Sequence, residues 1–315
     1  TSGILLRLNR TSFGGKLSLA PIVIFAFNRP SHLRRLLNSL LANQEAKESE
    51  ITIFIDGPRV EDDQRLILEV VSTIEAFSGY AEINTIRNKT NKGLATSVLA
   101  GIDSIFVNHE TTIVLEDDLI VASKFLKFCN EGLARFIDYP SIASIQGYSP
   151  ILFNNGKGTY FLKGADCWGW ATWKDRWEQT SFFGKELLDQ IKTKKLANEF
   201  NLEGSNNYVD LLEKQILGEI NSWAILWHTS MFLENRLSLY PPYSLVSNEG
   251  GDGLGTHFGN NQLYSQKISD EVDFSLPSSI EQSEEYRDAL IEFYQKNFKK
   301  FTFSQRILGK LKRLF

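Results

Sequence analysis

Cysteine is scarce in this chain of 315 residues, and basic charge does not dominate it. The two cysteines, Cys129 and Cys167, are too few for a disulfide framework or a cysteine-based zinc site, and they indicate a reducing compartment. The formal net charge of −4 argues against a general nucleic-acid binder, whose affinity rests on a basic surface. Any phosphate that the protein binds is therefore expected to meet a few residues locally.

Long apolar runs are also missing. The sequence has no stretch of about 18 apolar residues, the length that a membrane-spanning helix needs. The hydrophobic share of 42% and the charged share of 23% predict a folded globular protein with a large core. The chain does not begin with methionine, and Met231 is the only methionine in it. We interpret residues 1–15 either as an expression-tag remnant or the edge of a truncation, or as an ordinary surface extension. They play no part in the functional argument.

The first part of the chain alternates strand-forming apolar runs with helical patterns. Strands are expected at residues 21–27, 51–55, 81–86 and 111–115, and helices at residues 31–41, about 66–74 and 94–106. Ser31 is the predicted N-cap of the first helix. This order predicts an α/β fold with a mostly parallel sheet flanked by helices. After a further helix from Phe125 and a strand at residues 142–145, the sequence becomes rich in aromatic residues.

Four polar clusters follow these strands or open the next helix. They are Asn28-Arg29, Asp56-Gly57, Asn91-Lys92-Gly93 and Glu116-Asp117-Asp118. Ligands of parallel sheets bind at the carboxyl ends of the strands. We therefore expect the four clusters to converge on one rim, which would be the binding cleft.

The acidic triplet Glu116-Asp117-Asp118 directly follows the apolar residues of its strand. If the strand continued, Glu116 and Asp118 would point to one face and Asp117 to the other. Three adjacent, partly desolvated carboxylates repel one another, and a divalent cation would relieve that repulsion. Hard cations commonly bind one or two carboxylates together with substrate phosphates. A solvated acidic turn is the alternative, but the position after a buried strand favours a functional site.

The order of these motifs resembles inverting GT-A glycosyltransferases, most closely the N-acetylglucosaminyltransferase I type and its bacterial relatives. The similarity runs from about Pro21 to Phe258 and covers most of the chain. It implies the Rossmann-like GT-A form of the α/β fold, with an acceptor-side α+β half. The expected divisions are a GT-A domain at residues 16–265, split into a nucleotide-binding half (16–125) and an acceptor half (126–265), and a helical, basic amphipathic tail at residues 266–315.

The resemblance implies roles for the rim residues. Arg29 holds the place of an arginine that contacts the donor, and Asp56 that of an aspartate that hydrogen-bonds uracil. Asp118 holds the place of the ligand to Mn²⁺ (or Mg²⁺), while Glu116 and Asp117 would face the nucleotide ribose and the donor sugar. From the residues alone, Arg29 could instead cap a helix or pair with an acid, and Asp56 could simply make a turn. The other donor-binding candidates on the rim are Asn28, Asn91, Lys92 and Gly93.

A segment rich in glycine and tryptophan, residues 164–177, resembles the stretch that follows the metal strand in the bacterial enzymes. Aromatic rings suit the C–H faces of sugars, and a glycine lets the backbone approach a ligand. We predict donor contacts for Trp168, Gly169 and Trp170, with a buried aromatic cluster as the alternative. The two tryptophans that follow, four residues apart on an expected helix, are predicted to pack in the core.

The segment Glu219–Trp227 resembles the place of the catalytic base, where bacterial relatives usually read Asp-Ser-Trp. This sequence has Asn221 there, and an amide cannot accept the proton of an acceptor hydroxyl at neutral pH. Three explanations stay open: Glu219 is the base, the aspartate was changed to asparagine by engineering, or the base lies elsewhere, as at Asp252 or Asp166. A strand would place Glu219 on the same face as Asn221, whereas a helix would not.

His257 lies in a glycine-rich loop and resembles the late histidine of this family, which contacts the metal or the diphosphate. Neutral imidazole can bind Mn²⁺, so His257 joins Asp118 as a metal-ligand candidate, with a solvated loop histidine as the alternative. Glycines at positions 250, 251, 253 and 255 predict a loop that closes over the donor and excludes water.

The last residues, 299–315, combine six basic side chains with an apolar set. A basic amphipathic helix of this kind can lie on an anionic membrane, or it can dock on the protein or on a neighbouring chain. The first reading suits lipid-linked acceptors and a cytoplasmic enzyme held peripherally at the inner membrane.

These residues and the resemblance together predict a metal-dependent inverting glycosyltransferase. It would move a sugar from a nucleotide-sugar donor, a UDP-sugar such as UDP-GlcNAc, to a hydroxyl of a glycan or lipid-linked glycan, as in bacterial surface polysaccharide synthesis. One rival is a non-catalytic nucleotide-sugar or glycan-binding GT-A domain, which Asn221 favours. The other is a nucleotidyltransferase, but Phe27–Pro30 lacks the glycine-rich first loop that such enzymes normally show.

Overall fold

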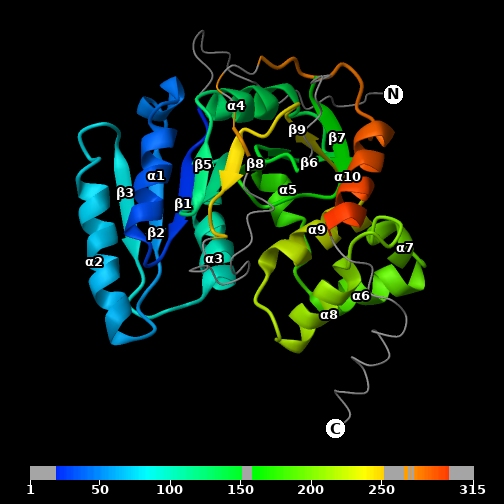
Figure 1. Cartoon of the computed structure of the whole chain (residues 1–315), viewed down its shortest axis with the longest axis horizontal. Coiled ribbons are helices and arrows are strands. Elements are labelled where there is room, and N and C mark those ends of the chain that lie inside the picture. The colour runs from blue at the N-terminus through cyan, green and yellow to red at the C-terminus, as the bar shows by residue number, and fades with distance from the viewer. Residues whose placement is uncertain (1–18, 151–157, 252–265, 269, 271–272, 298–315) are drawn as a thin grey trace, which may run out of the picture.

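A computed structural model describes residues 19–150, 158–251, 266–268, 270 and 273–297. Within this part of the chain the main sheet has eight strands in the order β3-β2-β1-β4-β8-β6-β9-β7 (Figure 1). The strands are β1 (Ile22–Ala26), β2 (Ile51–Ile55), β3 (Ile83–Arg87), β4 (Thr111–Glu116), β6 (Ile142–Gln146), β7 (Tyr160–Lys163), β8 (Trp170–Trp173) and β9 (Leu237–Tyr240).

The first four strands in the sequence form a parallel block. β1 pairs in parallel with both β2 and β4, and β2 pairs in parallel with β3. Beyond β4 the sheet becomes mixed, because β8 runs antiparallel to β4 and β6, while β9 runs parallel to β6 and antiparallel to β7. The predicted α/β fold with a mostly parallel sheet is confirmed, and the parallel block brings the carboxyl ends of β1, β2 and β4 to one edge.

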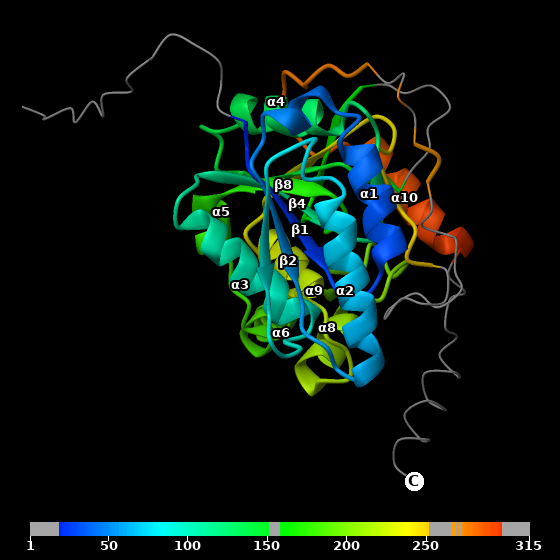
Figure 2. The same cartoon turned by 90° about the vertical axis from the view of Figure 1, so that its left-hand side faces the viewer.

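Helices cover both faces of the sheet, as the view in Figure 2 shows for α1, α2 and α3. Along β1, Ile22, Ile24 and Ala26 pack into a core shared with α1 (Pro30–Leu40), α2 (Glu61–Glu75) and α4 (Phe125–Arg135). The alternating residues Val23 and Phe25 pack into a second core with α3 (Leu94–Phe106) and α9 (Trp223–Leu233). This period of two explains why the strand reads as continuously apolar: both of its faces are buried.

The second half of the chain adds a helical cluster and a short second sheet. The helices α6 (Gly184–Thr193), α7 (Ala197–Phe200) and α8 (Tyr208–Leu217) pack with α9 around their own small core, and α5 (Lys174–Glu178) directly follows β8. A 3₁₀ helix, η1, spans Gln44–Lys47, and α10 (Glu284–Asn297) packs on β7. The strands β5 (Leu119–Val121) and β10 (Val246–Asn248) pair antiparallel as a two-stranded sheet.

Most predicted elements are found within a few residues of their expected bounds, but the N-cap of the first helix is wrong. The helix α1 begins at Pro30 and its N-cap is Arg29, so Ser31 lies inside the helix. Proline is favoured in the first helical turn because it lacks the N–H that would be unsatisfied there. The division at residue 125 remains a prediction, and the main sheet runs continuously across it from β4 to β8.

A cluster of four tryptophans forms the centre of the second core. The ring of Trp170 is stacked on Trp223 at 5.6 Å and lies 5.3 Å from Trp227 and 6.0 Å from Trp177, measured between ring centroids. Its side chain is 0% exposed. This corrects the prediction that Trp170 contacts the donor: its strand β8 lies inside the sheet, so the ring is enclosed on the α9 side.

No helix in the described ranges is both long and apolar enough to cross a membrane.

Replacing Trp170 with alanine is expected to lower the free energy of unfolding by about 3–5 kcal/mol, because it removes the central ring of this cluster and leaves a cavity. Urea denaturation followed by circular dichroism measures the change. Phe183→Ala is the matched control, since that ring is 72% exposed, and its loss should cost less than about 0.5 kcal/mol. Equal effects of the two substitutions would contradict the packing described here.

Candidate active site

The acidic triplet lies where β4 ends. Glu116 is the last residue of β4 and pairs with Phe25 of β1, while Asp117 and Asp118 form the turn into β5. The backbone N–H of Asp117 donates to the Phe25 carbonyl at 3.0 Å, and its carboxylate accepts the Phe27 N–H at 3.2 Å. The expectation that the three side chains alternate as in a strand is therefore wrong beyond Glu116, because the chain turns there.

Arg29 and Asp118 form an ion pair across the rim. The Arg29 Nη1 atom donates to Asp118 Oδ2 at 3.0 Å, and each side chain is 16% exposed. The other oxygen, Asp118 Oδ1, is buried without a hydrogen-bond partner among the described residues. Asp118 therefore keeps one desolvated oxygen that a ligand of positive charge would satisfy.

The electrostatics of the triplet follow from its burial. Burial and the charges of Asp118 and Asp117 raise the pKa of Glu116 to about 8, against a smaller lowering by Arg29. Burial and the charge of Asp118 likewise raise the pKa of Asp117 to about 7, against lowering by Arg29 and by the Phe27 N–H. Without a further cation, these carboxylates retain protons near neutral pH.

The end of β10 lies directly on Asp118. The backbone N–H of Glu249 donates to the Asp118 carbonyl at 2.8 Å, and the N–H of Gly250 donates to the Asn248 side chain at 2.9 Å. A Cβ atom on Gly250 would lie 2.4 Å from Asp118 Oδ2. Glycine is thus required at position 250 so that the backbone can approach the carboxylate. The sequence indicates a loop here but not this contact.

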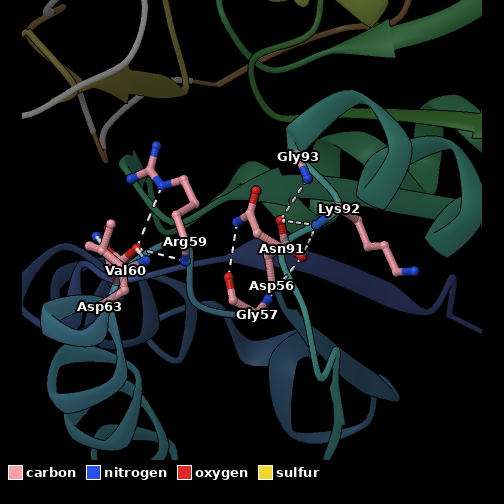
Figure 3. A network of polar contacts seen from close by, with 9 residues as sticks. Asp56, Gly57, Arg59, Val60, Asp63, Asn91, Lys92 and Gly93 are labelled. Atoms are coloured by element: carbon pink, nitrogen blue, oxygen red, sulfur yellow. Dashed lines mark hydrogen bonds and ion pairs between the residues drawn. The ribbon is translucent and has the colours of Figure 1, made fainter.

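Asp56 is the centre of a second network on the same rim (Figure 3). Its Oδ1 accepts the backbone N–H groups of Gly57 and Lys92, both at 2.9 Å, and the side-chain amide of Asn88 at 3.2 Å. Its Oδ2 accepts the N–H groups of Lys92 at 3.1 Å and Gly93 at 2.9 Å. Asn91 adds a hydrogen bond to the Gly57 carbonyl at 2.9 Å. The network ties the end of β2 to the loop that opens α3, while the amino group of Lys92 lies away from the carboxylate.

Asn28 is held by a residue that sequence reasoning missed. Its side-chain amide donates to Asp63 at 2.6 Å, and Asp63 also accepts the N–H groups of Arg59 at 2.9 Å and Val60 at 3.2 Å. Burial acts to raise the pKa of Asp63, but these three hydrogen bonds and the nearby Arg59 charge lower it overall. An aspartate in the first turn of α2, three residues after its N-cap, is the signal that could have found it.

Asn221, which occupies the place of the expected base, reaches the same rim. A Cβ atom on Gly93, whose φ is +79°, would lie 3.2 Å from the Asn221 side-chain nitrogen. Glu219 and Asn221 are exposed and lie in the bend between α8 and α9. Neither residue is in a strand or a helix, so the secondary structure does not decide whether they share a face.

Trp168 and Gly169 directly precede β8, the strand that pairs with β4. Gly169 has a φ of +64°, and a Cβ atom there would lie 2.7 Å from Val246 of β10 and 3.5 Å from Leu115. The missing Cβ of Gly169 therefore makes room for the side chains of Val246 and Leu115. Trp168 is partly buried, and its ring meets Tyr148 edge-on at 4.7 Å between centroids.

Several residues for which the sequence analysis makes a prediction lie outside the part of the chain that the structure describes. They are Asp252, His257, and the whole of residues 1–15 and 299–315.

The carboxylates of the rim fit a divalent cation only in part. Among the residues described, no group of three or more histidine, cysteine, aspartate or glutamate side chains is arranged to hold a metal ion. The unpartnered Asp118 oxygen and the raised pKa values of Glu116 and Asp117 nevertheless indicate uncompensated negative charge. A hard cation that completes its shell with substrate phosphates needs only one or two protein carboxylates, so the donor set fits such a site.

Comparison with known proteins supports a glycosyltransferase. Residues 22–149 match the family model described as Glycosyl transferase family 2, and they contain β1 to β6 with all four polar clusters of the rim. This match supports a glycosyltransferase of the GT-A type.

The chain also shares limited similarity with several solved structures. TarS of S. aureus is 18% identical with a TM-score of 0.32, over 42% of this chain and 22% of that one. GalNAc-T7 with UDP, GalNAc and Mn²⁺ is 15% identical with a TM-score of 0.38, over 51% and 36%. The mannosyltransferase PcManGT from Pyrobaculum calidifontis, in complex with GDP-Man and Mn²⁺, is 12% identical with a TM-score of 0.34, over 56% and 50%. The chain thus spans half or less of the length of each.

The stability of the protein without added metal is expected to fall as the pH rises from about 4.5 to about 8. Glu116 and Asp117 have folded-state pKa values of about 8 and 7, above their ordinary values of 4.5 and 3.8. In that window the folded state therefore binds more protons than the unfolded state, which makes stability decrease with pH. Calorimetry at several pH values measures the melting temperature, and millimolar Mn²⁺ should reduce the decline.

The double substitution Glu116→Gln with Asp117→Asn isolates this effect, because it removes both titrating groups but keeps their size. Its melting temperature should vary less with pH than that of the unaltered protein. Parallel curves for the two proteins would show that the triplet does not titrate as described.

Proposed function

We propose that the protein is a metal-dependent inverting glycosyltransferase that transfers a sugar from a nucleotide-diphosphate sugar, such as a UDP-sugar, to a hydroxyl of a glycan or lipid-linked glycan. The observation that carries this proposal is the desolvated acidic triplet beside Arg29 at the carboxyl end of β4. A divalent cation bound there would neutralise part of the charge that develops on the leaving diphosphate.

Asp118 is the proposed ligand of the cation, through the oxygen that has no partner among the described residues. Arg29 is held 3.0 Å from the other oxygen of the same carboxylate, so it can turn toward a diphosphate when a metal takes over that charge. Glu116 and Asp117 flank this position and would face the ribose and donor sugar. His257, outside the described residues, stays a second candidate ligand.

We propose that Asp56 acts chiefly by shaping the nucleotide side of the rim. Its two oxygens already accept four different N–H donors, and a carboxylate has about four lone-pair sites. A uracil N–H would have to replace one of these donors. The fixed loop at residues 88–93 would then present Asn91, Lys92 and Gly93 to the nucleotide.

Asn221 lies beside Gly93, where its amide can hydrogen-bond to a hydroxyl of donor or acceptor but cannot remove a proton. Glu219 is exposed in the same bend and is one candidate for the base. The lipid-linked acceptor and the membrane contact of residues 299–315 are part of the proposal and involve residues outside those described.

Asp118→Asn is expected to lower metal-dependent donor hydrolysis about 100-fold or more, because it removes the charge that holds the cation. The measurement is release of nucleotide from a panel of UDP-, GDP- and dTDP-sugars with Mn²⁺. Asp189→Asn is the matched control: it makes the same change of charge on the exposed side of α6 and should have no effect.

If the unaltered protein neither hydrolyses nor binds any nucleotide-sugar, the result favours the alternative function, a non-catalytic glycan-binding domain. If hydrolysis is equally fast in the Asp118→Asn variant, the metal assignment is wrong.

A further inference from the structure

A pocket of about 420 Å³ lies in the second half of the chain, and its lining includes residues 166–168, which come shortly before β8. Its wall comes from β7 and the segment leading into β8, from α7, α8 and α9, and from α10. Figure 1 shows α10 beside β7 and the cluster of α6 to α9 adjoining it. The volume is within the range of small-ligand pockets, which is about 300–1,000 Å³.

The pocket combines aromatic rings with polar groups. Phe200, Tyr208 and Tyr240 are among the rings, and an ion pair of 2.8 Å between Lys163 and Glu199 lies in the wall. Sugars bury a C–H face on aromatic rings and offer hydroxyls to charged and amide groups, so this mixture suits a saccharide. A lipid chain would cover the Lys163–Glu199 pair without hydrogen-bonding to it, whereas sugar hydroxyls can hydrogen-bond to both groups.

Asp166 is a half-buried acid in the wall of this pocket. Its Oδ1 accepts the backbone N–H of Cys167 at 2.8 Å, which fixes the carboxylate at the wall. Burial raises the pKa of Asp166, while this hydrogen bond acts to lower it. A fixed carboxylate with a raised pKa is a better proton acceptor than a fully solvated one.

Asp166 and the acidic triplet lie at the same end of two paired strands, because β8 runs antiparallel to β4 with Trp170 opposite Val114. Burial raises the pKa of the Cys167 thiol, and so do the charges of Asp166, Glu116 and Asp118, in that order. Residues 166–169 precede β8 and the triplet follows the apolar part of β4, so the pocket acid and the proposed metal site are brought to one edge of the sheet. The neighbouring Trp168 lines the same pocket.

We propose that this pocket is the acceptor site for a saccharide and that Asp166 is the catalytic base that Asn221 cannot be. The proposal rests on the proposed function. In the transfer step, the acceptor hydroxyl oxygen forms a bond to the anomeric carbon of the nucleotide-diphosphate sugar. The bond from that carbon to the diphosphate oxygen breaks, its electron pair leaves with the nucleotide, and the hydroxyl proton passes to the Asp166 carboxylate.

Two further residues of the pocket, His228 and Ser222, support Asp166 as the base and the pocket as the acceptor site. His228 lines the pocket, and burial lowers its pKa, so it stays neutral, with Nδ1 2.8 Å from the Ala165 carbonyl. Ser222, one residue after Asn221, also lines the pocket, which joins the acceptor site to the position of the expected base. Glu219, in contrast, does not line it.

Saturation-transfer NMR on the whole chain tests the pocket without any donor. The probes are methyl and octyl β-glycosides of glucose, galactose and N-acetylglucosamine. Saturation of the sugar-ring protons is expected, and it should fall several-fold in Leu211→Trp, which narrows the pocket from α8. Leu217→Trp, on the same helix but 67% exposed and outside the pocket, should leave it unchanged.

Saturation of the octyl chain alone, or of no probe at all, would overturn the assignment to a saccharide. Equal signals from Leu211→Trp and Leu217→Trp would place the binding elsewhere.

Transfer to the bound glycoside, with Mn²⁺ and the active nucleotide-sugar, tests the base. Asp166→Asn should lower this rate about 100-fold or more, while nucleotide affinity stays unchanged. Asp189→Asn should change neither. Transfer at the unaltered rate in Asp166→Asn overturns the base. If no nucleotide-sugar binds, the proposed function fails, whereas the NMR result still decides what the pocket binds.

Discussion

The repulsion among three neighbouring carboxylates at the end of β4 is the constraint on which the rest of this site depends. The parallel block buries β4 on both faces, and the turn at Asp117 and Asp118 keeps the charges together instead of dispersing them. Arg29 offsets part of the repulsion, yet the pKa values of Glu116 and Asp117 remain raised. A protein retains such a site at a cost in stability, which is typical of sites that receive a cation or a charged ligand.

Hydrogen bonds fix the backbone and side chains around the triplet. Asp56 fixes the loop before α3, Asp63 fixes Asn28, and the N–H of Glu249 fixes the Asp118 carbonyl. Each of these bonds joins segments that are distant in sequence at the carboxyl edge of the sheet. Preorganised dipoles and charges of this kind are the usual source of catalytic power in group transfer. The second half of the chain then adds the aromatic pocket, whose acid lies at the same end of the paired strands β4 and β8 as the triplet.

Much of the nucleotide side could be predicted from the sequence, because hydrophobic periodicity locates the strands and polar residues after them mark the rim. The same reasoning failed where tertiary contacts decide. Trp170 reads like a sugar-binding tryptophan, but its strand lies within the sheet and the ring is enclosed. Asp63 was missed because its partner Asn28 is 35 residues away. The pocket beside Asp166 was beyond prediction, since β7, α7 to α10 and the segment before β8 meet only in the folded chain.

Binding of Mn²⁺, followed by electron paramagnetic resonance in the presence and absence of UDP and GDP, tests the central claim most directly. Free Mn²⁺ gives a strong signal that is lost on binding. The account predicts that one of the nucleotides strengthens Mn²⁺ binding about tenfold or more, because the diphosphate supplies ligands that the described carboxylates do not. It also predicts that Asp118→Asn abolishes this coupling. Mn²⁺ binding that neither nucleotide strengthens, or coupling that survives in Asp118→Asn, would contradict the account.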